Sequence, residues 1–397
     1  MTTLSSKIWF GNNHPAGYVS LSLDFINTID TRISALHYQK YDEINFTESC
    51  ISDHTKWPII LDELFKLSTG MAKFTLKFNS LSTSFSIAKF YKQIFHLSDG
   101  NVQFLSIEND SKVGIYTINF LAKRRYFDNS KDWSFGIIWD GKNEGYLYEY
   151  IDSIKKIKYN DSQVEILICG PQPSFKIDLK YKLIETDQNT ELFANISRKK
   201  NLIINQAEYE NICIAHNRYK LNDNFIKSFD KFHHDYDVCV VKQVLLDTGE
   251  RVPDWVSQAS DEKLTANYLL PYGVYSPFQY IPGGLIIGKK HILNAIPFNE
   301  LATWNMAEDV ELSQRLRESG FLPRLNSRTV ATVLNLRKEI ITDFKDPDID
   351  FFYKNLDLFH QDYRNKVNKY NFLKRNITQL IFQPRIFVEK LKSRFKV

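Results

Sequence analysis

The 397-residue sequence contains no run of 18 apolar residues, and its first residues, MTTLSSKIWFGNNHPAG, contain no apolar leader segment. We therefore expect a cytoplasmic protein that is neither secreted nor membrane-spanning. The sequence also has no CxxC pair, and three of its four cysteines lie in apolar runs. This pattern favours reduced core cysteines over disulfides or a zinc site.

The charge is too uneven for a general nucleic-acid binder, and we expect no nucleic-acid partner. Residues 364–397 contain ten Lys or Arg and one Glu, so this basic tail carries +9, which leaves −5 for the rest of a chain with net charge +4. Apolar residues recur in the tail at helical spacing, which is typical of a helix that binds an anionic membrane surface. The alternative is a helix that packs on the body and exposes its basic face.

Enough apolar residues are present for packed cores, because the hydrophobic fraction is 43% and the aromatic fraction is 14%. Strand-like and helix-like segments alternate through most of the chain, which predicts an α/β protein. We predict a first α/β domain over residues 1–125, a second over 126–340, and basic amphipathic helices over 341–397. In the second domain the alternation indicates a parallel sheet, with ligands at the carboxyl ends of its strands.

The first domain resembles the later half of a class I methyltransferase, with a YDEI strand, the helix ILDELFKLS and a strand that leads into a final hairpin. Members of that family need a glycine-rich turn after the first strand, so that the backbone can approach the cofactor. Here the turn reads FGNNHPAG, with a different glycine spacing, and LSLDF follows too soon for a first helix. The resemblance implies a shortened, non-catalytic, Rossmann-like domain that does not bind S-adenosylmethionine; an active methyltransferase is the alternative.

Four segments of the second domain resemble, in order, a GT-A nucleotide-sugar glycosyltransferase of the family-two kind. They are SFGIIWDG, SRKKNLIINQAEYENICIAHNR, GGLIIGKKHI and WNMAEDVELSQRL. The resemblance implies a GT-A fold, a nucleotide-sugar donor and a glycan or lipid-linked acceptor hydroxyl. It further implies inverting transfer in the synthesis of a bacterial surface polysaccharide, such as lipopolysaccharide O-antigen or capsule, at the inner face of the cell membrane.

Inverting transfer needs a carboxylate that removes the acceptor proton. The resemblance assigns this base to Asp309 and an orienting role to Glu308. The alternative is that both are ordinary acids at the positive end of a helix. On the acceptor side we expect Trp304, Asp254, Trp255, Gly283 and Gly284.

For the donor, the resemblance and the positions of strand ends predict contacts from residues of four segments. These are Trp139, Asp140, Gly170, Lys199, Lys200, Asn201, His216, Asn217 and Arg218. Asp140 could equally be a turn residue, and the lysines could form a solvated helix start.

The turn at which the family holds Mg²⁺ or Mn²⁺ with aspartates reads His216-Asn217-Arg218 here, and Asn335 stands where many relatives have a late histidine. We therefore predict no metal ligand at these positions and favour a metal-independent enzyme, in which Arg218, Lys199 or Lys200 holds the diphosphate; bound Mg²⁺ or Mn²⁺ is the open alternative. The alternative is a chain that has lost catalysis and serves as a binding or scaffold subunit of a glycan-assembly complex. We expect the adjacent residues 233–235, His-His-Asp, to form a surface turn rather than a metal site.

Overall fold

The computed structural model describes residues 6–80, 82, 85–110, 114–157, 162–260, 265–303, 306–347, 377 and 384. The chain divides into two compact units, of which the first comprises Met1–Gln258 and Asn267–Asp346 and the second Ala259–Ala266 and Pro347–Val397. Apart from Ile377 and Pro384, the basic tail lies outside the described residues, so its membrane contact stays a prediction. Within the described ranges, no helix has both the length and the apolar character needed to cross a membrane.

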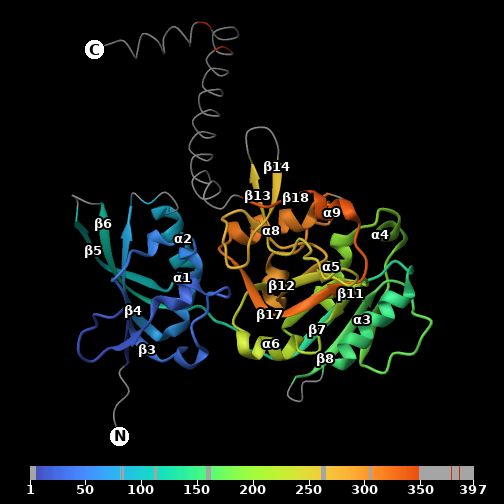
Figure 1. The fold of residues 1–397 in the computed structure, drawn as a ribbon, viewed down its shortest axis with the longest axis horizontal. Coiled ribbons are helices and arrows are strands. Elements are labelled where there is room, and N and C mark those ends of the chain that lie inside the picture. Colours follow the sequence, from blue (N-terminus) through green and yellow to red (C-terminus); the bar gives the residue numbers. More distant parts are fainter. Residues whose placement is uncertain are drawn as a thin grey trace. The chain divides into compact units, whose positions relative to one another are not determined.

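The N-terminal part of the first unit forms a six-stranded sheet of order β2-β1-β3-β4-β6-β5 (Figure 1). The strands are β1 (Lys7–Phe10), β2 (Val19–Leu21), β3 (Tyr41–Phe46), β4 (Ser68–Asn79), β5 (Val102–Asp110) and β6 (Ile115–Lys123). Strands β1 to β4 are mutually parallel, and β6 runs antiparallel to both β4 and β5. The helices are α1 (Trp57–Leu67) and α2 (Ile87–Ser98), with 3-10 turns η1 (Leu23–Asn27), η2 (Ala35–His37) and η3 (Ile51–Asp53).

Helix α1 forms where apolar residues recur every three or four positions, and Pro58 fits its first turn. The helix buries Ile60, Leu64 and Phe65 completely, and the Phe65 ring lies 4.6 Å from that of Phe74 on β4. Ser86 begins α2 by accepting a hydrogen bond from the backbone of Lys89. The predicted YDEI strand, the ILDELFKLS helix and the strand that leads into a final hairpin are therefore present, with α2 between that strand and the hairpin.

The turn after β1 is occupied by a carboxylate of the chain itself. The Glu48 carboxylate accepts hydrogen bonds from the backbone amides of Asn12 and Asn13 and from the Trp9 indole. A Cβ on Gly11, whose φ is +128°, would lie 2.0 Å from Glu48 Oε2. Residues 11–18 then lead directly into β2 with no helix between the strands, which agrees with the short connection seen in the sequence.

The second sheet has eight strands in the order β11-β17-β12-β16-β10-β7-β8-β9. Its strands are β7 (Trp133–Ile138), β8 (Val164–Cys169), β9 (Tyr181–Ile184), β10 (Asn211–His216), β11 (Tyr219–Leu221), β12 (Val238–Leu245), β16 (Leu285–Lys289) and β17 (Pro323–Val333). Strands β10, β7, β8 and β9 are parallel, but β16 is antiparallel to its neighbours β10 and β12. The prediction of a parallel sheet is thus wrong at β16, because the segment between β12 and β16 forms short strands instead of a crossover helix.

The helices of this part are α3 (Glu144–Lys156), α4 (Gln188–Leu192), α5 (Ile196–Gln206), α6 (Phe225–Phe232), α7 (Lys290–Ala295), α8 (Glu308–Glu318) and α9 (Lys338–Thr342). Among the short strands, β13 (Val256–Ser260) pairs with β15 (Gln279–Tyr280), and β14 (Thr265–Leu269) pairs with β18 (Phe344–Lys345). Helices α3 and α6 share one apolar core with the sheet. A Cβ on Gly136 of β7 would lie 2.3 Å from Ile203 of α5, so this glycine lets α5 pack directly on the strand.

All four cysteines are free and buried, as the sequence predicts.

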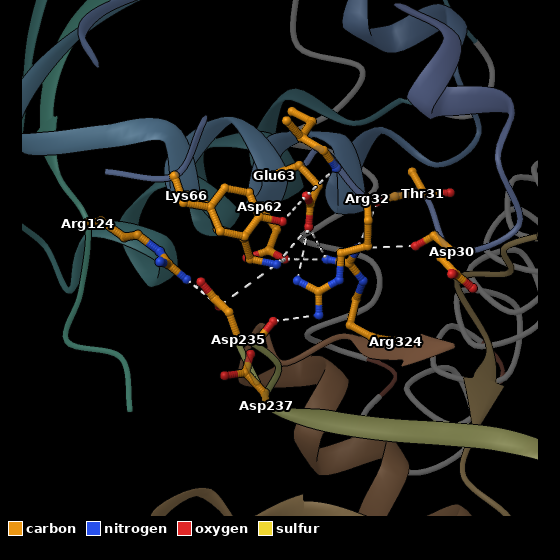
Figure 2. Close-up of polar contacts among 12 residues, drawn as sticks. Asp30, Thr31, Arg32, Asp62, Glu63, Lys66, Arg124, Asp235, Asp237 and Arg324 are labelled. Atoms are coloured by element: carbon orange, nitrogen blue, oxygen red, sulfur yellow. Dashed lines mark hydrogen bonds and ion pairs between the residues drawn. The ribbon is translucent and has the colours of Figure 1, made fainter. Parts of the chain in front are cut away.

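A buried cluster of charged residues joins helix α1, beside the first sheet, to strand β17 of the second sheet (Figure 2). Arg324 extends from β17 and donates hydrogen bonds to Asp62 at 2.6 Å and to Glu63 at 2.9 Å, both on α1. Lys66 of α1 lies 2.7 Å from Glu63 and 2.8 Å from Asp62. Burial alone would raise the pKa of the Glu63 carboxyl, but the nearby cations outweigh it and hold that pKa below its usual value.

This ion cluster corrects the expectation of a surface turn at residues 233–235. Asp235 is 3% exposed and pairs with Arg124 at 2.6 Å, and His234 is 4% exposed. The turn is buried because Arg32, Tyr38, Lys66 and Arg124 pack over it, and local polarity in the sequence does not reveal such partners.

Candidate active site

A cavity of about 580 Å³ opens where β7 and β10 end. Five of the nine predicted donor residues line it: Asp140, Lys199, His216, Asn217 and Arg218. Asn335 also lines the cavity, so the turn after β10 and the late asparagine lie together as the resemblance implies. Its other lining residues were not predicted from the sequence, namely Ile138, Lys142, Asn143, Tyr146, Glu191, Ala194, Ile196 and Arg337.

The wall of the cavity near β10 is positively charged. Burial lowers the pKa of His216 to about 3, and the neighbouring cations Arg218, Lys200 and Lys199 contribute to the same shift. The imidazole is therefore neutral at physiological pH, and the positive charge around it comes from the three side chains.

The cations of the cavity differ in how they are paired. Lys199 lies 2.7 Å from Glu191, and Lys142 lies 3.9 Å from Asp140. Within the described part of the chain, no acid forms an ion pair with Arg218 or Arg337, and the buried Nε of Arg218 has no hydrogen-bond partner. These two guanidinium groups are thus available to an anionic ligand.

Four predicted donor residues hold the walls of the cavity instead of facing it. Trp139 is 3% exposed and donates from Nε1 to the Lys142 carbonyl at 2.7 Å. A Cβ on Gly170 would lie 2.2 Å from the Trp139 carbonyl oxygen, so Gly170 serves this packing. The Asn201 side chain donates a hydrogen bond to the Phe298 carbonyl and accepts one from the Phe298 amide. Lys200 is fully buried. Trp139 points away because Ile138 lines the cavity, and successive residues of an extended chain face opposite sides.

The predicted base and the glycine pair come together across 26 residues of sequence. The backbone amide of Gly283 donates to Asp309 Oδ2 at 2.6 Å, and the amide of Val310 donates to Oδ1 at 2.9 Å. A Cβ on Gly283 would lie 2.9 Å from Glu308 Oε1 and 3.1 Å from Asp309 Oδ2. A side chain at this position would therefore displace both carboxylates.

The same glycine pair connects Asp309 to the cavity. The carbonyl of Gly284 accepts a hydrogen bond from the amide of His216, a lining residue, at 3.2 Å. A Cβ on Gly284 would lie 2.5 Å from the Tyr219 hydroxyl oxygen. Asp309 itself is partly buried and does not line the cavity. It lies behind the end of β10, one glycine pair away from the charged wall.

Burial raises the pKa of Asp309 above its usual value, and the adjacent Glu308 carboxylate raises it further. Lys200 and the two backbone amides oppose this shift. Glu308 is bound by Lys200, whose Nζ lies 2.9 Å from Oε1. A carboxylate with raised proton affinity, fixed by backbone donors, has the properties of a general base near neutral pH.

The predicted acceptor residues lie in different surroundings. The Asp254 carboxylate is fully buried and accepts bonds from the Gln243 and Trp255 amides, from Arg251 and from the Tyr272 hydroxyl. Trp255 is 3% exposed and bonds the Val274 carbonyl. Both residues therefore stabilise their own loop and do not face an acceptor. Trp304 lies outside the described residues.

Among the described residues, no group of three His, Cys, Asp or Glu side chains could hold a metal ion. Metal independence remains a prediction, to be tested by chelation.

No protein-family model matches the sequence, and no curated protein matches it. Among solved structures, the chain is similar to S. aureus TarS 1–349 in complex with UDP-GlcNAc, at 16% identity over 56% of this chain and 64% of that chain, with a TM-score of 0.39. For the same protein in complex with UDP, the identity is 17% over 51% of this chain and 60% of that chain, with a TM-score of 0.38. GalNAc-T7 with UDP, GalNAc and Mn²⁺ is 12% identical over 55% of this chain and 46% of that chain, with a TM-score of 0.43. The chain spans less than two thirds of the length of each.

Proposed function

We propose that this protein is a glycosyltransferase with a GT-A domain, which moves a sugar from a nucleotide-sugar donor to an acceptor hydroxyl with inversion. One observation carries the proposal: a backbone-held carboxylate, Asp309, lies one glycine pair away from a cation-lined cavity at the carboxyl ends of parallel strands. The cavity volume of about 580 Å³ is within the range of small-ligand sites, about 300–1,000 Å³.

The proposed reaction uses these groups in a single displacement. Asp309 accepts the proton of the acceptor hydroxyl while that oxygen attacks the anomeric carbon. The bond from the anomeric carbon to the diphosphate oxygen breaks, and negative charge develops on the departing diphosphate. Arg218 and Arg337, which pair with no acid among the described residues, are the groups that we assign to this charge.

We propose that the reaction needs no divalent cation. Arginine suits a diphosphate because its planar guanidinium donates two parallel hydrogen bonds. Lys200, which the sequence also predicts to hold the diphosphate, is fully buried and paired with Glu308, so we assign that role to the two arginines.

The acceptor that we propose is a glycan or lipid-linked hydroxyl of a bacterial surface polysaccharide, such as O-antigen or capsule. The charge distribution of the sequence supports a location at the inner face of a membrane, because residues 364–397 carry +9 and the rest carries −5. The sequence resemblance is the sole support for the polysaccharide pathway.

For the N-terminal part we propose a shortened methyltransferase-like domain without catalysis. The parallel strands β1 to β4 and the closing antiparallel strands β5 and β6 support this assignment. Its lack of S-adenosylmethionine binding is supported by Glu48, which occupies the amides of the turn after β1.

Thermal stability in the presence of UDP-, GDP-, CDP- and dTDP-sugars tests the function directly. A ligand at 100 times its Kd raises the unfolding free energy by about 2.7 kcal/mol, so the correct donor should raise the melting temperature by several degrees. The stabilising donor should then be hydrolysed or transferred by the full-length protein. Stabilisation without turnover would favour the binding or scaffold subunit, and no stabilisation by any donor would contradict the proposal.

A further inference from the structure

Lys200 is a lysine that the protein buries completely behind the wall of the cavity. It lies on α5, is 0% exposed, and its ammonium is 4.8 Å from the centre of the Phe298 ring. Phe298 is itself fixed, because its backbone exchanges two hydrogen bonds with the Asn201 side chain on the same helix. Burying a lysine costs several kcal/mol unless it is paired, so its position calls for an explanation.

The partner of this lysine is Glu308, whose Oε1 lies 2.9 Å from Nζ. Glu308 is the direct neighbour of Asp309, and the side chains of both acids crowd against the backbone of Gly283. The Glu308 and Asp309 carboxylates thus lie side by side against Gly283. Among the contacts described, the Lys200 ammonium binds only Glu308. Asp309 is held instead by the backbone amides of Gly283 and Val310.

We propose that Lys200 is a positioning residue: by holding Glu308 in a buried ion pair, it keeps the neighbouring Asp309 ionised as the base. This inference rests on the proposed function, because it concerns the base of that reaction. It differs from the role expected from the sequence, in which Lys200 would contact the donor diphosphate.

The groups around Asp309 define what should happen when the lysine is removed. Glu308 faces it from α8, Lys200 from α5 and Tyr280 from β15, and burial raises the pKa of Tyr280, with Asp309 adding to the shift. His216 on β10 lies within the influence of Lys200 and is neutral. Without the lysine the two carboxylates would face each other with no cation, and the pair would retain a proton to higher pH.

Three variants test this: Lys200→Met, Glu308→Gln and the double variant. In the pH profile of kcat, the midpoint of the acid limb, where the rate increases with pH, should move up by about one pH unit or more in Lys200→Met. At a pH below that midpoint, the variant's rate should therefore be about tenfold lower than that of wild type. The limb should fall in Glu308→Gln and return toward the wild-type position in the double variant. Donor Kd should stay within about twofold in Lys200→Met, since the lysine is fully buried and does not line the cavity.

Two results would overturn the inference. One is an acid limb that stays in place in Lys200→Met; the other is a donor Kd that rises tenfold, which would place Lys200 on the diphosphate. If Lys200→Met does not fold, Glu308→Gln and the double variant, which leaves neither member of the pair charged, decide the question. An unshifted limb in Glu308→Gln would then refute it.

A second readout needs no turnover. The pKa of Asp309 is raised above 3.8 in the folded protein, so the unfolding free energy falls as pH rises from 3.8 to the folded pKa. Lys200→Met should extend this fall to higher pH, and adding Asp309→Asn should remove the extension. A wild-type protein that turns over no donor but shows this behaviour would refute the proposed function and keep the ion-pair role. Absence of the extension would refute the inference itself.

Discussion

The wall of the cavity and the ion cluster between α1 and β17 are both rich in arginine, yet they differ in how those arginines are satisfied. Arg324 in the cluster is 2% exposed and donates to two carboxylates and to the Thr31 carbonyl (Figure 2). The Nε atoms of Arg218 in the cavity and of Arg32 in the cluster are both buried without a partner, but Arg32 pairs with Glu63, whereas Arg218 pairs with no acid among the described residues. Cations whose acceptors come from their own chain hold the fold together, whereas cations that lack them are available to a ligand.

The same contrast separates the acids. Asp254 receives donors from four neighbouring groups and holds a loop. Asp309 receives one backbone donor on each oxygen, which leaves acceptor capacity on both. The Asp254 carboxylate is therefore saturated by its own loop, whereas Asp309 keeps the acceptor capacity that its proposed role as base requires.

The largest effect should follow from Asp309→Asn. An asparagine keeps the shape of the side chain but cannot take the acceptor proton, so the transfer rate should fall by about 10²–10⁴ or more. Donor affinity, measured by calorimetry, should change by only a few fold. Glu311→Gln is the matched control, because Glu311 is on the same helix and pairs with Arg315 at the surface. Near-normal turnover in Asp309→Asn would remove Asp309 from the role of base.

Arg324→Met should cause the largest loss of stability. It leaves Asp62 and Glu63 with one cation fewer in a buried place, and removing one partner of such a group costs about 3–5 kcal/mol. Urea unfolding measures this loss. Lys220→Met is the control on the neighbouring strand β11, since Lys220 and its partner Glu149 are 40% and 48% exposed and such a pair is worth about 0–1 kcal/mol. Equal losses in the two variants would refute a special role for the cluster.

Arg218→Gln should leave the unfolding free energy within about 1 kcal/mol of wild type but weaken donor binding about tenfold or more, because a hydrogen bond to a charged group contributes about 1.5–3 kcal/mol. Arg198→Gln is the matched control: this arginine is at the start of α5, pairs with Asp187 and does not line the cavity. If Arg218→Gln destabilised the protein as Arg324→Met does, the distinction between the two regions would fail.

The smallest effect should come from chelation. With arginines opposite the diphosphate, EDTA should leave donor Kd and turnover unchanged within about twofold. A buffer with added Mg²⁺ or Mn²⁺ and no chelator is the reference. Inactivation by EDTA that either ion reverses would mean that metal ligands exist outside the described residues or arrive with the substrate.

Features encoded by local patterns could be predicted from the sequence. Apolar runs located β7, β8, β10, β12 and β16, and acids before an amphipathic segment located the start of α8. The polar turn at residues 216–218 was likewise found because it directly follows an apolar strand. The hydrogen bond from Gly283 to Asp309 was not predicted, because the resemblance assigned the glycine pair to the acceptor side and Asp309 to the base without a contact between them.

Features that depend on distant partners were missed. The bonds from Arg324 to Asp62 and Glu63 join residues 262 and 261 positions apart, and no periodic pattern marks them. Arg337 and Lys142 lie in loops after strands, where sequence gives no direction for a side chain. The placement of Trp139 was within reach, since the alternation of side chains along β7 determines which of its end residues faces the cavity.

Glu48 gives the N-terminal part of the first unit an intramolecular ligand, and diluting the protein does not remove it. Its carboxylate is tethered beside the amides of Asn12 and Asn13, so it is present there at an effective concentration of about the millimolar range or higher. Any free carboxylate, including that of an amino-acid-derived cofactor, would have to compete with it. The turn after β1 is therefore saturated from within the chain, because the amides of Asn12 and Asn13 already have an acceptor and offer no free donor to a soluble anion.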